Sequence, residues 1–174
     1  MCIVKSEELR NIAESIKDHS HNNILSDAVI CRVAIKNVLF MSNMATCFGL
    51  SELEEVFKDP FLPESFQGSK YLEDSFRDFL TLVIEKIPNE ELVELMNTRF
   101  YIWDLTEIHA LVYLIYAEGT VLIKDGKSLN FIEKKLEMML PYSIFNEYKK
   151  LKAVTHNELE SDVIKELGDT STSD

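Results

Sequence analysis

The chain has 174 residues, of which 30 are acidic and 18 are basic, so its formal net charge at pH 7 is -12. Nucleic acids and anionic membranes carry charge of the same sign, which argues against direct binding to either and favours a basic protein partner. Because 46% of the residues are hydrophobic and only 5 are glycine and 4 are proline, we expect a folded protein of long helices joined by short connections.

The chain shows no pattern typical of export or of a membrane span. Its three cysteines are odd in number and widely spaced, which favours a reducing compartment over a disulfide framework. Acidic residues interrupt the segment 1–17, where a signal peptide needs an apolar stretch. The most apolar region, 28–48, is broken by Arg32, Lys36 and Asn37 and so lacks the roughly 20 apolar residues of a membrane helix. We expect a cytoplasmic protein that is not attached to a membrane.

The first third of the chain predicts three helices. Ser6 can cap a first helix, and a second runs over 26–48 with apolar residues around most of its circumference. Other helices should surround such a helix, so we expect 26–48 to be the central helix, ending at Gly49. Ser51 and Glu54 form a capping-box pattern that predicts a short third helix.

The segment from Asp59 to Gly68 has an unusual composition for a loop. It holds two prolines and one glycine, which exclude a regular helix, but it also carries the large apolar side chains of Phe61, Leu62 and Phe66. Two interpretations remain open. These side chains fold back over the core, as aromatic residues in loops often do, or they anchor a partner.

A strongly patterned helix is predicted next. Ser69 opens it and Pro88 ends it. Its apolar residues share one face: Leu72, Phe76, Phe79, Leu80, Val83, Ile84 and Ile87. Asn89 then caps a shorter helix predicted to end at Met96, whose early acidic residues are stabilised by the positive end of the helix dipole.

The region after this pair of helices predicts a buried helix followed by a loop. Asp104 and Glu107 form a capping-box pattern before the apolar run 108–117, which Gly119 is expected to terminate. Residues 120–127 read as an extended loop, since Asp125 and Gly126 favour a turn and no partner strand is evident.

The last part of the chain predicts further helices and a tail. Ser128 starts a helix that Pro141 ends, and Ser143 starts another, with the pattern leaving open whether 143–167 is one helix or two. These elements predict an all-α fold: a compact multi-helix bundle of seven to nine helices with at most a trace of extended structure near 120–127. We expect one helical domain over 1–167 and a flexible acidic tail over 168–174.

Candidate catalytic and metal-binding residues are few. His19 and His21 stand two apart, an extended-chain spacing with no further ligand nearby, and His109 diverges from Glu107 on the same helix. Cys31 and Cys47 lie in apolar helical runs, where burial suppresses thiol reactivity. No phosphate-binding loop or nucleophile motif is present. We therefore predict no catalytic residue, no metal site and no cofactor, and expect that the protein is not an enzyme.

Acidic residues gather in three places, and most such clusters are solvated faces: Glu52, Glu54, Glu55, Asp59 and Glu64; Glu90, Glu91 and Glu94; and Glu158, Glu160, Asp162, Glu166 and Asp169. The first cluster stands apart because it adjoins aromatic residues, and aromatic anchors ringed by charge suit a protein interface. We predict a partner-binding surface, called the 52–66 surface below, made of Glu52, Glu54, Glu55, Phe57, Asp59, Phe61, Leu62, Glu64 and Phe66.

Charge and the absence of catalytic motifs lead to two main functional hypotheses. The first is an acidic binding module that masks a basic partner surface, as an inhibitor or immunity protein neutralises a nuclease toxin. The second is a helical regulatory or assembly module that acts through a hydrophobic groove or a homo-oligomer interface. A third, an unrecognised helical enzyme, requires a polar pocket around His109. The sequence leaves the partner and the oligomeric state open.

Overall fold

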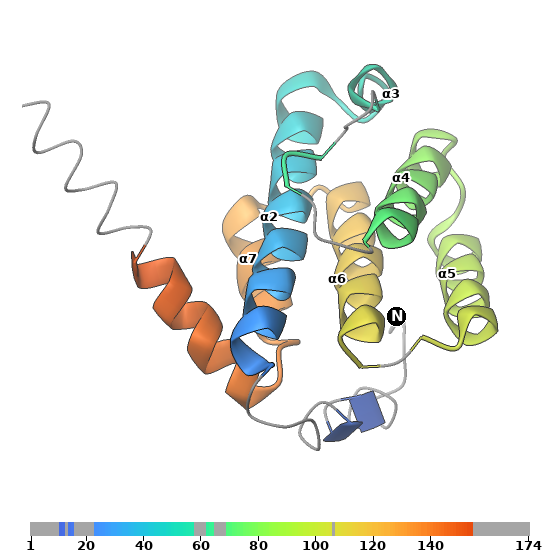
Figure 1. Ribbon diagram of the computed structural model, residues 1–174. Helices are drawn as coiled ribbons and strands as arrows, with labels where there is room; N and C mark the ends of the chain where they lie inside the picture. The colour runs from blue at the N-terminus through green and yellow to red at the C-terminus, as the bar shows by residue number, and fades with distance from the viewer. Residues whose placement is uncertain are drawn as a thin grey trace, which may run out of the picture.

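The computed structural model describes residues 11–12, 14–15, 23–57, 62–64, 69–105 and 107–154, and all regular structure in these residues is helical (Figure 1). Residues 11–12 and 14–15 are helical, and the helices that follow are α2 (Ile24–Phe48), α3 (Leu53–Val56), α4 (Lys70–Ile84), α5 (Asn89–Trp103), α6 (Glu107–Lys124), α7 (Leu129–Glu137) and a further helix over 142–154. The predicted all-α bundle is confirmed. Among these helices we find none with the length and apolar content needed to cross a membrane. The predicted tail, 168–174, and the segment 155–167 lie outside the described residues.

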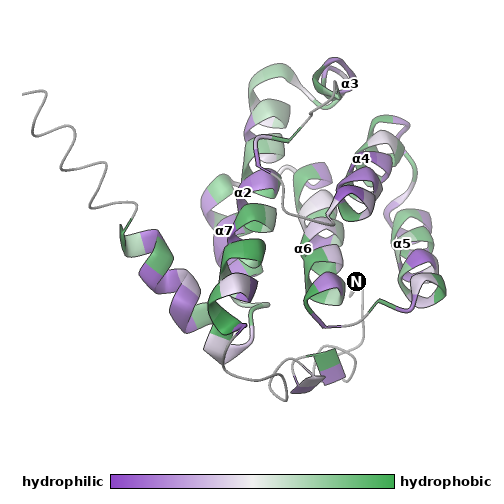
Figure 2. Ribbon diagram, viewed as in Figure 1, coloured by the Kyte–Doolittle hydropathy of each residue, from purple (hydrophilic) through white to green (hydrophobic). Residues whose placement is uncertain are grey.

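Two helices, α2 and α6, form the centre of the bundle. Helix α6 packs against α2, α4, α5 and α7, and every residue over 110–117 is buried. Helix α2 packs against α3, α6 and α7, but Val29 and Phe48 on it remain exposed. Figure 2 shows hydrophobic residues recurring along both helices. The segment 26–48 therefore shares the central position that the sequence assigned to it alone, and α6 is the more fully buried of the two.

The prediction that a helix ends at Gly119 is wrong, because α6 continues to Lys124. A Cβ atom built on Gly119 would lie 2.6 Å from Cγ1 of Val38, so the absence of a side chain lets α6 approach α2 closely. The predicted extended loop over 120–127 is helical up to Lys124 and then turns at Gly126, which has a φ of +63°. Close packing against α2 therefore explains Gly119, and the glycine that follows the end of the helix is Gly126, about two turns further on.

Helix α5 is longer than predicted, since it extends past Met96 to Trp103. Its buried residues Leu92, Met96 and Phe100 recur every four positions, so the face turned to the core continues through the whole helix. Asp104, predicted to cap the next helix, instead ends α5 in the left-handed conformation with a φ of +46°. Asp tolerates this conformation better than most residues do.

Other predicted helix boundaries agree more closely with the structure. Gly49 ends α2 with a φ of +92°, and the Ser128 Oγ accepts a hydrogen bond from the backbone N–H of Phe131 at the start of α7. Pro141 was predicted to end this helix, but α7 already ends at Glu137, and the next helix begins at 142, one residue before Ser143, which was predicted to start it. The capping box predicted at Ser51 is wrong: Glu52 occupies the N-cap of α3, and no side chain caps that helix.

The two cysteines that the structure describes lie in different environments. Cys31 is buried in the core, and burial raises the pKa of its thiol, with the nearby Asp27 carboxylate adding to the effect. Cys47 lies near the end of α2 and is exposed. The prediction that both thiols are shielded by apolar surroundings therefore holds for Cys31 alone, because Cys47 falls on the solvent side of its helix.

This difference predicts selective thiol labelling. In a Cys2→Ser background, a maleimide at pH 7 is expected to modify the native protein once, at Cys47, because Cys31 must be exposed and ionised to react. Adding denaturant should permit a second modification, which intact-mass spectrometry would detect. Rapid labelling of Cys31 in the native protein, located by peptide mapping, would contradict the burial of this side chain.

Candidate functional site: an apolar groove between α4 and α5

The 52–66 surface is only partly available to a partner. Glu52, Glu54 and Glu55 are exposed around α3. Leu62 is buried, with 7% of its surface accessible, and Phe57 packs partly buried against the same core. For these two apolar residues the structure agrees with the interpretation that the segment folds back over the core.

Glu64 belongs to a contact that ties its segment to α2. Its carboxylate accepts a hydrogen bond of 2.6 Å from the Lys36 Nζ, and its backbone carbonyl accepts one of 2.8 Å from the Asn37 Nδ2. Asn37 is buried and also donates to the Tyr116 Oη at 3.2 Å. Glu64 is therefore engaged within the fold. The predictions for three further members of the 52–66 surface, Asp59, Phe61 and Phe66, lie outside the described residues.

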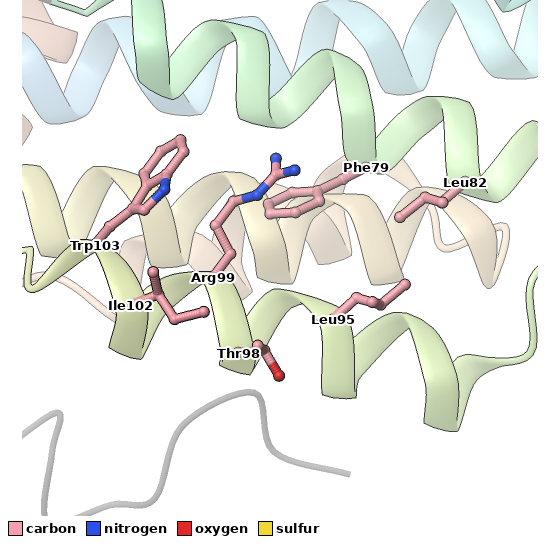
Figure 3. Close-up of a pocket in the computed structure, with 7 residues that line it drawn as sticks. All are labelled: Phe79, Leu82, Leu95, Thr98, Arg99, Ile102 and Trp103. Carbon is pink, nitrogen blue, oxygen red and sulfur yellow. The ribbon is translucent and has the colours of Figure 1, made fainter.

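A groove that the sequence prediction missed lies between α4 and α5 (Figure 3). It encloses about 390 Å³ and is lined by Phe79, Leu82, Leu95, Thr98, Arg99, Ile102 and Trp103. The first two residues come from α4 and the other five from the single helix α5. Along α5 the lining positions follow the three-and-four spacing of one helix face, so the groove runs along the helix.

The α5 side of the groove exposes large apolar side chains. Leu95 is 48% exposed, Ile102 is 74% exposed and Trp103 is 38% exposed. The neighbouring Tyr101 is also exposed, at 58%. Because the adjoining face of α5, with Leu92, Met96 and Phe100, is buried against the core, the apolar part of this helix is wider than its core contact. A single exposed apolar residue is ordinary, but a contiguous group beside a hollow marks an interaction surface.

Arg99 supplies the guanidinium group inside the groove, and its charge is already engaged. Its Nη1 donates a hydrogen bond of 2.8 Å to the Asp78 carboxylate on α4. The guanidinium carbon lies 5.3 Å from the centre of the Phe79 ring and 5.4 Å from the centre of the Trp103 ring. Figure 3 shows this side chain reaching from α5 towards α4 between those two rings. Arg99 thus links both walls of the groove by an ion pair and by cation–π contacts.

Tyr113 of α6 supports the groove from the core side. Its Oη donates a buried hydrogen bond of 2.7 Å to the backbone carbonyl of Met96 on α5. Its ring lies 5.5 Å from Phe79 and 6.3 Å from Trp103 between ring centres, in edge-on arrangements. Burial raises the pKa of Tyr113, although the Arg99 charge lowers it in part. The hydroxyl therefore stays protonated and remains a donor at neutral pH.

His109 lies beside this cluster as a half-buried residue. Its ring meets the Tyr71 ring edge-on at 6.0 Å between ring centres, and Tyr71 lies 5.7 Å from Trp103. These neighbours are aromatic, whereas the enzyme hypothesis needs converging polar groups around His109. Among the residues that the structure describes, no group of three His, Cys, Asp or Glu side chains is placed to hold a metal ion. His19 and His21 fall outside those residues.

The sequence contained a signal for the groove. The prediction missed this signal because it ended the helix at Met96. Extended to Trp103, the helix has a buried row, Leu92, Met96 and Phe100, and a second apolar row at Leu95 and Ile102. Two apolar rows on one helix are more than a single core contact requires. The second row is the part that remains exposed.

Comparison of the chain with protein-family models, with curated proteins and with solved structures finds no match. The functional conclusion therefore depends on the groove, its exposed apolar residues and the charge around it.

Proposed function

We propose that this protein acts by binding another protein, and that the groove between α4 and α5 is its binding surface. The observation that carries the proposal is the exposed apolar row of α5 beside a hollow of about 390 Å³. Trp103 and Ile102 have the size and position of interface anchors, which fill pockets and exclude water. The proposal corresponds to the second hypothesis from the sequence, a regulatory or assembly module, in the version that acts through a hydrophobic groove.

The partner in this proposal is a different protein, because charge disfavours a second copy. The segment from Lys70 to Asp104 carries eight acidic and four basic residues. A symmetric dimer through the groove would bring the same acidic segment of each copy together. Repulsion of this kind opposes self-association most strongly at low ionic strength.

The acidic-inhibitor hypothesis is a special case of the same proposal, in which the bound partner is basic and is inhibited. The net charge of -12 favours a basic partner, and a nuclease toxin is one such partner. The groove moves the apolar contacts from the 52–66 surface to α5, since Leu62 is committed to the core. Inhibition itself is supported only by the charge, whereas binding is supported by the charge and by the groove.

The test is site-specific crosslinking followed by affinity measurement. A photoreactive amino acid placed at Ile102 and expressed in the source organism is expected to crosslink one predominant protein. The same amino acid at Met138, which is 83% exposed and follows α7, should not capture it. Equal capture at both positions would show that exposure alone produces the crosslink and would contradict the proposal.

The purified partner then permits a matched comparison of variants. The double variant Leu95→Asp/Ile102→Asp is expected to weaken binding by at least about 10-fold, because carboxylates in an apolar contact must be desolvated. The control Met138→Asp should leave the dissociation constant unchanged. Calorimetry would measure both, and circular dichroism would show that each variant is folded. An unchanged affinity in the groove variant would overturn the proposal.

A further inference from the structure

The charges around the groove determine which partner chemistry fits it. Glu91 and Glu94 are exposed one helical turn before Leu95 and Thr98, so they continue the groove-lining face of α5 towards its start. The Arg99 charge inside the groove is neutralised by its ion pair with Asp78. The groove thus has apolar walls, and acidic side chains lie beside it towards the start of α5.

The shape of the groove favours a helical ligand. Helices α4 and α5 are joined by the short link 85–88 and form a hairpin at the edge of the bundle (Figure 1). A groove between two packed helices accepts the ridge of a third helix, whose side chains repeat at the same spacing as the walls. An added β-strand would need a sheet edge, and the described part of the chain contains no strand.

We infer that the groove binds a basic amphipathic α-helix of a partner protein. This inference rests on the proposed function. Apolar residues at three-and-four spacing on that helix contact Leu95, Ile102 and Trp103, while lysine or arginine residues beside them face Glu91 and Glu94. The apolar contacts supply most of the affinity, and the acidic residues select the sign of the ligand's charge and speed its association at low salt.

The chain carries its own reporter for this interaction, since Trp103 is its single tryptophan and lies in the groove. The probe is a peptide of leucine and lysine with leucine along one helix face, 15 residues long to match α5. Binding should shift Trp103 emission to shorter wavelength and protect the indole from acrylamide. A peptide with glutamate in place of every lysine should bind at least about 10-fold more weakly at low salt, and the difference should shrink near 0.5 M salt.

Two matched double variants separate a local effect from that of net charge. Glu91→Gln/Glu94→Gln is expected to weaken binding of the lysine peptide by about 3-fold to 10-fold. Glu54→Gln/Glu55→Gln removes the same charge from exposed positions on α3 that belong to the 52–66 surface and do not line the groove, so it compares the two candidate surfaces directly. If the groove is the binding surface, this variant should change the affinity less than about 2-fold. All four substitutions are at exposed sites, so unfolding is not the expected cause of any loss.

Several results would overturn the inference. These are equal affinity for the two peptides, no change in Trp103 emission with either, or equal effects of the two double variants. Each of these results would leave the proposed function intact, provided that the photoreactive residue at Ile102 crosslinks a partner and that the Leu95→Asp/Ile102→Asp variant binds this partner more weakly. Failure of that crosslinking experiment would overturn the proposed function itself, so the two failures are distinguishable.

Discussion

Replacing Gly119 with leucine is expected to lower the free energy of unfolding by about 3 kcal/mol. Helices α2 and α6 lie close together here, and a Cβ at residue 119 would lie 2.6 Å and 2.7 Å from the two γ-carbons of Val38. A branched side chain as short as valine cannot move its γ-carbons out of the way. The two central helices must therefore separate, and the contact is lost along their length. Urea unfolding monitored by circular dichroism would measure the change.

A double-mutant cycle identifies the cause. Gly119→Ala gains helix propensity of up to about 1 kcal/mol but adds the Cβ that meets Val38, so a net loss is expected. Combining it with Val38→Ala should recover about 1–2 kcal/mol relative to the sum of the single variants, because the new methyl group fills space that the valine vacated. Gly126 is the control: open space surrounds it, but its φ is +63°, so Val38→Ala should not rescue Gly126→Ala. If the effects of Gly119→Ala and Val38→Ala on the free energy of unfolding simply add, the close contact between residue 119 and Val38 is contradicted.

Gly119 also shows where local sequence rules stop being sufficient. A glycine after an apolar helical run is typical of a helix end, and the sequence prediction applied that rule. The structure satisfies it at Gly126, while Gly119 lies inside α6 because of a neighbour that is 81 positions earlier in the chain, Val38. Packing between distant segments decides this case, and a single sequence does not display such a pairing.

The elements that were predicted well are those whose signals are local. Residues from Ser69 to Pro88 form one amphipathic face between a serine and a proline, and α4 follows that pattern from Lys70 to Ile84. Ser128 caps α7 as its position suggests. In α5 the sequence signals located the start to within one residue, but Pro88 and not Asn89 is the N-cap, and no side chain caps the helix. The stop signal was weak, and the predicted end came seven residues short of Trp103.

The candidate site was the harder prediction for a related reason. Charge and aromatic residues together drew attention to the 52–66 surface, yet composition does not reveal whether an apolar side chain faces solvent or the core. Leu62 faces the core, whereas Ile102, in a helix with a weaker charge signal, is 74% exposed. The net acidity and the expectation of a protein partner follow from the sequence. The location of the groove requires knowing which face of α5 packs on α4 and α6.

Replacing Tyr113 with alanine is expected to cost about 3–5 kcal/mol, the usual range for removing a large buried aromatic ring. This ring is fully buried and contacts Phe79, Phe100 and Trp103, so the cavity would open directly beneath the groove. Trp103 emission should shift to longer wavelength as water reaches the indole. Urea unfolding and fluorescence of the folded variant at low temperature would measure the two effects.

The conservative variant Tyr113→Phe separates the ring from its hydroxyl. It keeps the aromatic contacts and removes only the hydrogen bond to the Met96 carbonyl, so we expect a loss of about 1 kcal/mol and little change in Trp103 emission. Tyr142→Ala, at a residue that is 77% exposed, should change stability by less than about 0.5 kcal/mol. If Tyr113→Ala and Tyr113→Phe cost the same, the ring does not support the groove. If Tyr113→Ala weakens binding of the lysine peptide while Tyr113→Phe does not, the groove depends on aromatic packing from α6, which joins the binding surface to the centre of the fold.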